Sequence, residues 1–313
     1  MVDILLAVYN GEKYLEEQLE SIAAQTYQNW RLVIRDDGSS DYSMAIAHAF
    51  QKKYPEKKIE IYVNEVPTKS AKGNFMRLLD DAVSEYVMFC DQDDVWLPEK
   101  IEKTLKAMRY CEKKSGTKDV PVLVHGDLYV VDENLQIISD SMFRYQKLPK
   151  TTAVNQLLIQ NSVTGCTVMI NKKLQDMLKR ASDTKDMVMH DYWAALIASV
   201  FGKIVFMKQP LIKYRQHGDN SVGAMNASGI RYMYSRFKAG KTQFRNRMDD
   251  TMRQAGAFCG IYAVELQENP HKKLIENYAK LIKSLKVHKI MFCLSNKVMK
   301  YGIIRKIMQF VWS

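Results

Sequence analysis

The first half of the chain alternates short, continuously apolar segments with segments whose apolar residues recur at helical spacing. Residues 2–9, 30–35, 59–63 and 86–90 are predicted strands, and the segments between them are predicted helices. Strands without a polar face are typical of a mostly parallel sheet that helices cover on both sides. The pattern therefore predicts an α/β fold, and the later residues 122–125, 128–131, 163–170, 204–207 and 211–215 are further predicted strands.

The composition fits one large globular core with an appendage. The chain has 313 residues, of which 47% are hydrophobic and 26% are charged. Its five cysteines are scattered and have no CxxC spacing, which argues against a disulfide framework or a zinc site. The first residues lack the basic start of a signal peptide, and the apolar residues 192–207 are shorter than the roughly 20 residues of a membrane span. We therefore expect a cytoplasmic protein.

Charge divides the chain at about residue 225. Residues 226–313 contain 17 Lys and Arg against 5 Asp and Glu, whereas residues 1–225 contain 29 against 30. We expect a nearly neutral domain over 1–225 and a basic, helical region over 226–313. A basic amphipathic helix, with an apolar face formed by Ile303, Ile304, Ile307, Met308 and Val311, can lie on an anionic membrane. The alternative is a helical cap on the catalytic domain whose basic face is solvated.

Acidic residues follow two of the predicted strands. Ligands of parallel sheets bind beyond the carboxyl ends of the strands. Asp91, Asp93 and Asp94 come directly after the strand 86–90, and clustered carboxylates prefer water or a cation such as Mg²⁺ or Mn²⁺. Asp37 lies after the strand 30–35, where a carboxylate can accept hydrogen bonds from a base or ribose. The alternative in both places is a polar turn with helix capping.

Two further groups have a chemical and a structural interpretation. Asp191 stands at the start of a predicted helix, where it is either a general base or a helix cap. His217 follows the strand 211–215 and is either a metal or phosphate ligand or a structural histidine.

Together these segments resemble the family 2 glycosyltransferases of the GT-A fold, a Rossmann-like, mostly parallel sheet flanked by helices. The resemblance covers about residues 2–220, through Ala7-Val8-Tyr9-Asn10-Gly11, the acidic turns at 36–41 and 91–94, Gly165-Cys166 and His190-Asp191-Tyr192-Trp193. The wording "RDDGSSD", "CDQDDVWLPEK", "HDYW" and "YRQHGDNSVG" is similar to bacterial rhamnosyltransferases of cell-wall and capsular polysaccharides.

The resemblance implies a role for each motif. Ala7, Tyr9 and Asp37 would hold the nucleotide, and Lys72 would lie near the donor diphosphate. Asp91 and Asp93 would form the DxD motif with Asp94 beside them, leaving open which of Asp93 and Asp94 touches the Mg²⁺ or Mn²⁺. His217 would contact the metal or the diphosphate. Asp191 would be the catalytic base, although the usual Glu-Asp pair is His190-Asp191 here.

The expected reaction is a single inverting transfer of a sugar from a nucleotide-sugar donor to a hydroxyl of a glycan or lipid-linked acceptor. The resemblance favours dTDP-L-rhamnose, with a UDP-hexose as the alternative, and Trp96, Tyr192 and Trp193 are candidate walls of the sugar pocket. A nucleotidyltransferase is a weaker alternative, because the segment after the first strand is not a Gly-rich basic loop. Nucleic acid is not an expected partner, because the aromatic residues group with aliphatic ones and not with the basic ones.

Overall fold

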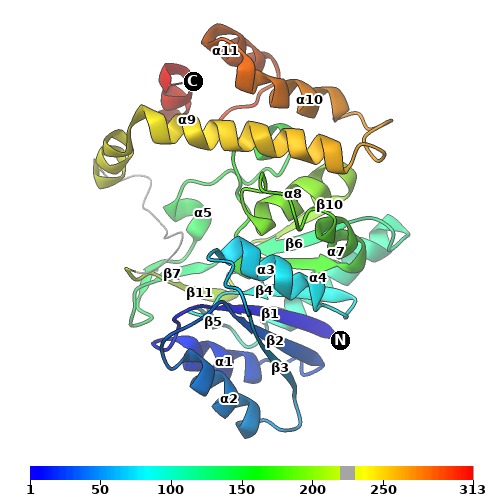
Figure 1. Cartoon of the computed structure of the whole chain (residues 1–313), viewed down its shortest axis with the longest axis vertical. Coiled ribbons are helices and arrows are strands. Elements are labelled where there is room, and N and C mark those ends of the chain that lie inside the picture. Colours follow the sequence, from blue (N-terminus) through cyan, green and yellow to red (C-terminus); the bar gives the residue numbers. More distant parts are fainter. Residues whose placement is uncertain (219–229, 313) are drawn as a thin grey trace.

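The computed structural model describes residues 1–218 and 230–312, with side chains described for 1–218 and 240–312. Its centre is a seven-stranded sheet in which β4 (Tyr86–Cys90), β1 (Val2–Val8), β2 (Trp30–Asp36) and β3 (Lys58–Val63) run parallel (Figure 1). On the other side of β4 lie β9 (Met169–Asn171), β6 (Val122–Gly126) and β10 (Lys203–Met207). Only β9 is antiparallel to its neighbours among these described strands, so the predicted mostly parallel sheet is confirmed.

Helices cover both faces of this sheet because its strands are apolar on both sides. Ile4 and Leu6 pack with α1 (Leu15–Ala23), α2 (Ser43–Lys53) and α4 (Lys100–Ser115). Leu5 and Val33 point to the opposite face, where α3 (Ala71–Asp80), α7 (Lys172–Lys179) and α8 (His190–Phe201) pack. The alternation of strand residues between two buried faces explains why no polar side was visible in the sequence.

A smaller sheet continues the structure beside the carboxyl ends of the large one. Its order is β5 (Val95–Trp96), β11 (Ile212–Arg215), β7 (Tyr129–Val131) and β8 (Ile137–Ser139). The short strands β5 and β8, like the single-turn helices α5 (Met142–Tyr145) and α6 (Val154–Leu157), carry too few residues to show a period in the sequence. The pairing of β5 with β11 brings the acidic turn beside the segment that contains His217.

The predicted strand at 163–170 is wrong over most of its length. Residues Gly165–Thr167 form a 3-10 turn, and only Met169–Asn171 pair as a strand. The apolar run is buried as a turn beneath the acidic loop, and burial alone does not separate a turn from a strand. Helix α3 also begins earlier than the predicted 74, because the Ser70 side chain caps it by accepting a hydrogen bond from the Gly73 amide.

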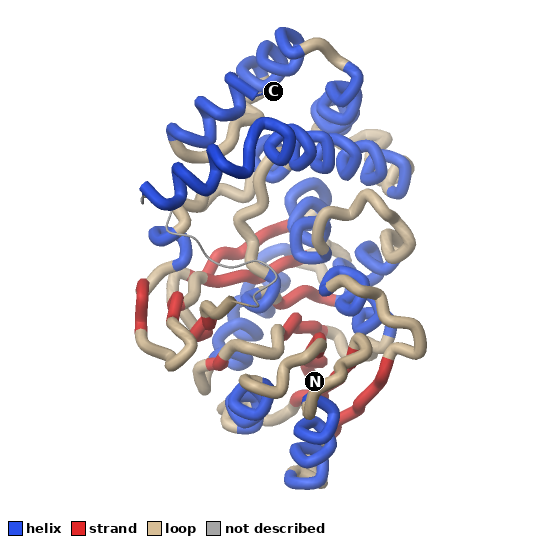
Figure 2. The backbone as a smooth tube through the Cα atoms, turned by 60° about the vertical axis from the view of Figure 1, so that its left-hand side comes forward, coloured by secondary structure: helices blue, strands red, loops and turns tan. Residues whose placement is uncertain are grey.

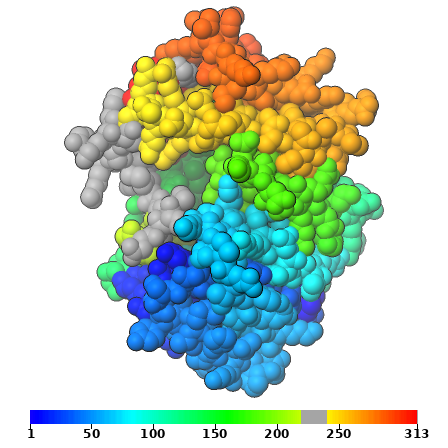
Figure 3. Space-filling view, in the orientation of Figure 1, coloured from blue at the N-terminus to red at the C-terminus, as the bar shows by residue number. Residues whose placement is uncertain are grey.

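The C-terminal region is helical, as predicted, and caps one end of the molecule (Figures 1 and 2). It consists of α9 (Ile230–Ile261), α10 (Lys272–Lys280), α11 (Lys286–Ser295) and α12 (Ile303–Trp312), with a left-handed Gly240 interrupting the helical geometry of α9. Residues from α9 to Val298 share one hydrophobic cluster with α8. The space-filling view shows the C-terminal helices seated against the catalytic part (Figure 3). Within the described residues, none of the helices is both long and apolar enough to cross a bilayer.

Candidate active site

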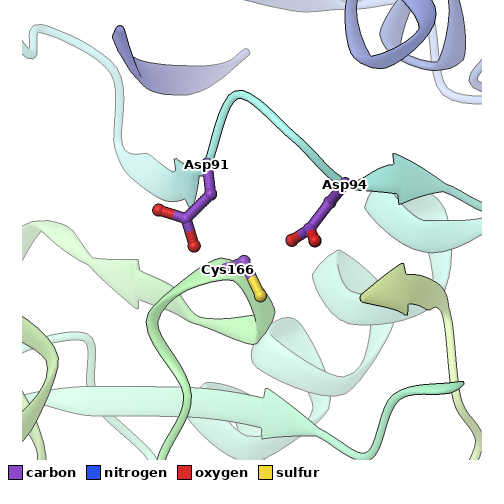
Figure 4. Close-up of side chains that lie close together, drawn as sticks. All are labelled: Asp91, Asp94 and Cys166. Atoms are coloured by element: carbon purple, nitrogen blue, oxygen red, sulfur yellow. The ribbon is translucent and has the colours of Figure 1, made fainter. Parts of the chain in front are cut away.

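The loop between β4 and β5 gathers carboxylates at the carboxyl edge of the sheet. Asp91 and Asp94 point toward each other and toward Cys166 in the turn Gly165–Thr167 (Figure 4). One carboxylate oxygen of each aspartate and the Cys166 sulfur all lie within 4.8 Å of one another. The structure therefore brings the first and last acidic residues of the loop together over a residue that comes about 70 positions later.

The acidic cluster has the properties of a site for a hard cation. Burial, and next the charge of Asp93, raise the pKa of both Asp91 and Asp94. Within the described part of the chain, no hydrogen bond of normal geometry reaches the buried Oδ2 of Asp94, and the Cys166 thiol is the weak donor beside it. Carboxylate oxygens in a buried, mutually repelling group suit Mg²⁺ or Mn²⁺. The residues present therefore fit the expected divalent cation.

Cys166 itself is a poor ligand for such an ion. Burial and the neighbouring Asp94 raise the pKa of its thiol well above the usual range. A hard cation prefers oxygen to sulfur, and only the thiolate is a strong metal ligand. Cys166 is better understood as a compact group that fills the space beneath the carboxylates.

His217 lies beside Asp93, as a ligand pair would. Its Nε2 is 2.9 Å from Asp93 Oδ2, and its ring centroid lies 4.7 Å from that of Tyr14. Asp93 and Asp94 therefore face different partners, since Asp94 Oδ1 accepts a hydrogen bond from the Arg215 amide at 3.2 Å. The geometry leaves two candidate sets of ligand atoms, one formed by Asp93 and His217 and the other by Asp91 and Asp94.

Two buried basic residues, which the sequence did not single out, surround the acidic loop. The Arg215 guanidinium donates to the Asp93 carbonyl at 2.9 Å and lies 4.5 Å from the ring of Tyr14. Lys100 is 2% exposed, its Nζ lies 3.4 Å from the Trp96 ring, and burial lowers its pKa to about 7. Arg215 is distant in the sequence from the acidic loop, and Lys100 lies in a helix with no sequence signal for its burial. Their positions beside the loop therefore become visible only in the fold.

Asp191 lies in the first turn of α8, beside the turn that holds Cys166. Its Oδ1 accepts hydrogen bonds from the Tyr192 amide at 2.5 Å and from Asn161 Nδ2 at 3.4 Å. Burial raises the pKa of this carboxyl to about 7. A carboxylate whose pKa lies near neutral pH is suited to take a proton, so the environment favours a base over a simple helix cap.

Gly165 lets the turn approach Asp191 closely. A Cβ at this position would lie 3.2 Å from His190 Nε2 and 3.6 Å from Asp191 Oδ2. His190 packs between Phe75 and Phe89, with centroid separations of 4.2 and 4.7 Å, and burial lowers its pKa to about 3. The histidine that replaces the usual glutamate is therefore a neutral packing group, which leaves Asp191 as the acidic member of the pair.

The expected donor-binding residues lie at neighbouring strand ends. Ala7 and Tyr9 are at the end of β1, and the Asp37 amide donates to the Val8 carbonyl at 2.9 Å. The side-chain amide of Gln92 bridges the edge, since it accepts from the Tyr9 amide at 2.8 Å and donates to the Tyr9 carbonyl at 2.9 Å. Tyr9 is thereby fixed by its backbone while its ring is 58% exposed.

The carboxylate of Asp37 already accepts three hydrogen bonds from Asn64 and Thr68. Its Oδ1 accepts from Asn64 Nδ2 at 2.7 Å and from the Thr68 amide at 2.6 Å, and its Oδ2 accepts from Thr68 Oγ1 at 2.8 Å. A carboxylate offers about four acceptor positions. Among the described residues no second donor reaches Oδ2, which leaves one position there for a group such as a base N–H or a ribose hydroxyl.

Lys72 lies in the first turn of α3, and its Nζ donates to the Met187 carbonyl at 2.5 Å. The contact places this ammonium near the segment that leads into Asp191. Of the expected sugar-pocket walls, Trp96 and Trp193 are buried in the core, and the Trp193 indole donates to the Tyr262 hydroxyl at 3.0 Å. Tyr192 is also only 4% exposed, so of the two possibilities for these rings, pocket wall or core, the burial favours the core.

Comparison with known proteins gives the same picture of the fold. The family model "Glycosyl transferase family 2" matches residues 3–116, which include β1 to β5 and the acidic loop. Among solved structures, S. aureus TarS in complex with UDP-GlcNAc superimposes with a TM-score of 0.55 at 16% identity, over 90% of this chain and 71% of that one. The architecture is thus the GT-A fold, as the sequence indicated.

Curated relatives match a larger part of the chain than the family model does. The dTDP-rhamnosyl transferase RfbG of Shigella flexneri is 27% identical over 232 residues, which cover 70% of this chain and 74% of the relative. A UDP-Glc:alpha-D-GlcNAc-diphosphoundecaprenol beta-1,3-glucosyltransferase, WfgD of Escherichia coli, is 26% identical over 162 residues, covering 51% of this chain and 59% of the relative. Both relatives transfer sugars, by their names from different nucleotide donors.

Proposed function

Because this chain is a glycosyltransferase with a family 2 domain of the GT-A fold, we propose that it transfers one sugar, with inversion, from a nucleotide-sugar to an acceptor hydroxyl in polysaccharide or cell-wall glycan synthesis. The observation that carries the proposal is that the turn Gly165–Thr167 contacts the acidic loop through Cys166 and Asp191 through Gly165. This arrangement supports carboxylates that hold a cation for the leaving diphosphate and a base for the acceptor hydroxyl at one edge of the sheet.

The nucleotide lies along the ends of β1 and β2 in this proposal. Asp37 accepts a hydrogen bond from the nucleoside through its free position on Oδ2, while the exposed ring of Tyr9 and the backbone near Ala7 line the edge. Lys72, at the amino end of α3, supplies positive charge toward the diphosphate. Asp91, Asp93, Asp94 and His217 would hold Mg²⁺ or Mn²⁺, which when bound offsets the negative charge on the leaving diphosphate.

Asp191 is the proposed general base. Its carboxylate takes the proton of the acceptor hydroxyl while that oxygen forms the new bond to C1 of the donor sugar. The bond from C1 to the diphosphate oxygen breaks on the opposite face, and the nucleoside diphosphate leaves with the electron pair. The burial of Asp191 keeps water away from its carboxyl group and raises the pKa of that group to about 7, which favours proton transfer near neutral pH.

The proposed donor is dTDP-L-rhamnose, and a UDP-hexose is the alternative. The motif wording and the length of the match to the Shigella flexneri rhamnosyl transferase support rhamnose, while the Escherichia coli glucosyltransferase supports UDP-glucose. The proposed acceptor is a lipid-linked or polysaccharide glycan, and residues 226–313 form a functional extension that keeps the enzyme at the inner face of the cell membrane.

A donor panel tests the proposal. The enzyme is incubated with Mn²⁺ or Mg²⁺, a GlcNAc-diphospho-lipid or rhamnose-terminated acceptor, and dTDP-rhamnose, UDP-glucose or UDP-galactose, and released nucleotide is measured. We expect turnover with dTDP-rhamnose that EDTA abolishes. Turnover with UDP-glucose alone would overturn the rhamnose donor, and pyrophosphate release from a nucleoside triphosphate and a sugar phosphate would favour a nucleotidyltransferase.

A further inference from the structure

The two last helices expose apolar side chains that a water-soluble cap would bury. Of the twenty exposed large apolar side chains in the part of the chain with described side chains, eight fall within residues 285–311. On α11 they are Val287, Met291 and Leu294, which recur at helical spacing. Contiguous apolar surface of this kind marks an interaction site more often than scattered single residues do.

Helix α12 divides its apolar residues between two faces. Met308 is 6% exposed and packs inward, whereas Ile303, Ile307 and Val311 are 78, 56 and 55% exposed. The sequence predicted one apolar face that included all of these residues. The structure assigns part of that face to the protein core and leaves the remainder, at four-residue spacing, to the outside.

The helices that carry the exposed stripes, α11 and α12, adjoin each other. Lys286 Nζ, at the start of α11, donates to the Val311 carbonyl near the end of α12 at 2.7 Å. Both helices lie at the end of the molecule farthest from α1 and α2 (Figure 1). We call this surface the basic pole, defined by the exposed apolar residues Leu285, Val287, Met291, Leu294, Ile303, Ile307 and Val311 and by the exposed lysines Lys283, Lys297 and Lys306.

The charge of the basic pole has one sign. Residues 277–313 contain eight Lys and Arg and no Asp or Glu. Lys289 is directed inward, 3.7 Å from Asp249, and Lys300 donates to the Ile159 carbonyl at 3.2 Å. Lys283, Lys297 and Lys306 are exposed, so cationic groups flank the apolar stripes.

We propose that the basic pole lies on an anionic lipid bilayer, with the stripes of α11 and α12 inserted among the headgroups and the flanking lysines on lipid phosphates. Helices of ten residues cannot span a bilayer but can lie in its interface. This inference defines the surface used by the membrane location in the proposed function, and it does not depend on the donor or on catalysis.

Other occupants fit the basic pole less well. A second copy meeting the same surface would oppose like charges across a two-fold axis. A sequence-independent site for single-stranded nucleic acid stacks successive bases on exposed aromatic rings. Within residues 285–311 Tyr301 is the single aromatic among the eight exposed large apolar side chains, and Trp312 packs edge-on against Phe244 at 5.7 Å.

Vesicle sedimentation tests the surface with the full chain. We expect wild type to sediment with phosphatidylglycerol-containing vesicles and much less with pure phosphatidylcholine. The variant I303S/I307S/V311S should lose at least about tenfold in affinity, because apolar insertion supplies part of the binding. Each substitution in K283Q/K297Q/K306Q should cost about fivefold at low salt. The matched control V83S/I137S/I138S changes three exposed apolar residues of the catalytic part and should bind as wild type.

The outcomes separate this inference from the proposed function. Sedimentation needs no turnover, so a failed donor panel leaves the result interpretable. Equal vesicle binding by wild type and both pole variants, or no binding by wild type, would overturn the proposal. A change from dimer to monomer in the serine variant would assign the surface to a second copy, and binding to single-stranded RNA in preference to vesicles would assign it to nucleic acid.

Discussion

The acidic loop and the basic pole each concentrate charge of one sign, but the carboxylates of the loop are buried and the lysines of the pole are exposed. Asp91 and Asp94 are held together under protein atoms, where burial and mutual repulsion raise their pKa. The lysines of the pole are instead exposed beside apolar side chains. A buried cluster can be neutralised only by something as small as an ion, whereas an exposed, partly apolar surface suits an extended partner.

The largest expected effect tests whether the acidic loop, and not the basic pole, is required for the cation-dependent reaction. Asp93→Ala should lower kcat/KM by about 10³-fold or more, because it removes a ligand for the charge that stabilises the leaving group. Pole variants should keep wild-type turnover with a water-soluble acceptor. The measurement is nucleotide release with a Mn²⁺ titration. If Asp93→Ala keeps most of its activity in EDTA, the cation has no catalytic role.

Binding of the cation should also be visible without turnover. At a hundredfold excess over its Kd, Mn²⁺ should stabilise wild type by about 2.7 kcal/mol, and Asp94→Asn should abolish the shift. Thermal melts of the two proteins with and without Mn²⁺ measure this. An unchanged Tm in wild type would contradict the site.

Asp191→Asn should reduce turnover by about 10²-fold or more while donor affinity stays near wild type, because the amide keeps the shape and cannot accept the proton. The pKa of about 7 predicts that wild-type kcat/KM falls as the pH drops below 7, since the base must be deprotonated. The residual activity of the variant should lose this dependence. A variant with the wild-type pH profile would remove Asp191 from the role.

The same carboxyl has a consequence for stability with a definite sign. Its folded-state pKa lies above the ordinary aspartate value of 3.8, so folding favours the protonated form, and stability falls as the pH rises from about 4 to 7. At pH 8 the variant Asp191→Asn should therefore be more stable than wild type, by up to about 4 kcal/mol. At pH 4 the difference should vanish. Urea denaturation at the two pH values measures it.

A smaller effect tests how closely the turn must approach the base. Gly165→Ala places a Cβ 3.2 Å from His190 Nε2, and we expect about a tenfold loss of kcat as Asp191 shifts. Gly260→Ala is the matched control, because its Cβ meets nothing within 4 Å inside α9. The control should gain about 0.5–1 kcal/mol of stability. Equal activity of the two variants would show that the turn can move away from Asp191 without affecting catalysis.

The smallest expected effect distinguishes the two faces of α12. Ile307→Ser should change the free energy of unfolding by less than about 0.5 kcal/mol because the side chain is exposed, whereas Met308→Ser should cost about 2 kcal/mol or more. Denaturant titrations of the two variants measure the difference. A large cost at Ile307 would mean that protein covers this stripe.

The sequence was sufficient where a single local pattern decides the structure. The strands before Asp37 and Asp91 are apolar throughout, so the fold and the carboxyl edge followed from them. The pairing of His217 with Asp93 spans 124 positions. The resemblance implied only that His217 contacts the metal or the diphosphate, not that it pairs with Asp93. Long-range pairings of this kind are set by topology, which composition and periodicity do not encode.

Other features were out of reach for physical reasons. The burial of Lys100 in α4 has no signal in the sequence, because a buried lysine is rare and nothing in its neighbours marks it. The apolar residues 163–170 predict a strand, although a turn at Gly165 buries them equally well. The period of α12 showed an apolar stripe, but not that Met308 is covered and Ile307 is not.

The contact between α8 and α9 sets an order of events during synthesis. Trp193, two residues after the base, is covered by Phe258 and Tyr262, and the Tyr262 hydroxyl also donates to the Met177 carbonyl at 2.9 Å. These partners are translated some 65 to 70 residues after Trp193, so the apolar side of α8 stays open while most of the chain is already made. A ribosome adding about 5–20 residues per second leaves it uncovered for several seconds. The packing around α8, the helix that carries Asp191, is therefore completed only near the end of translation.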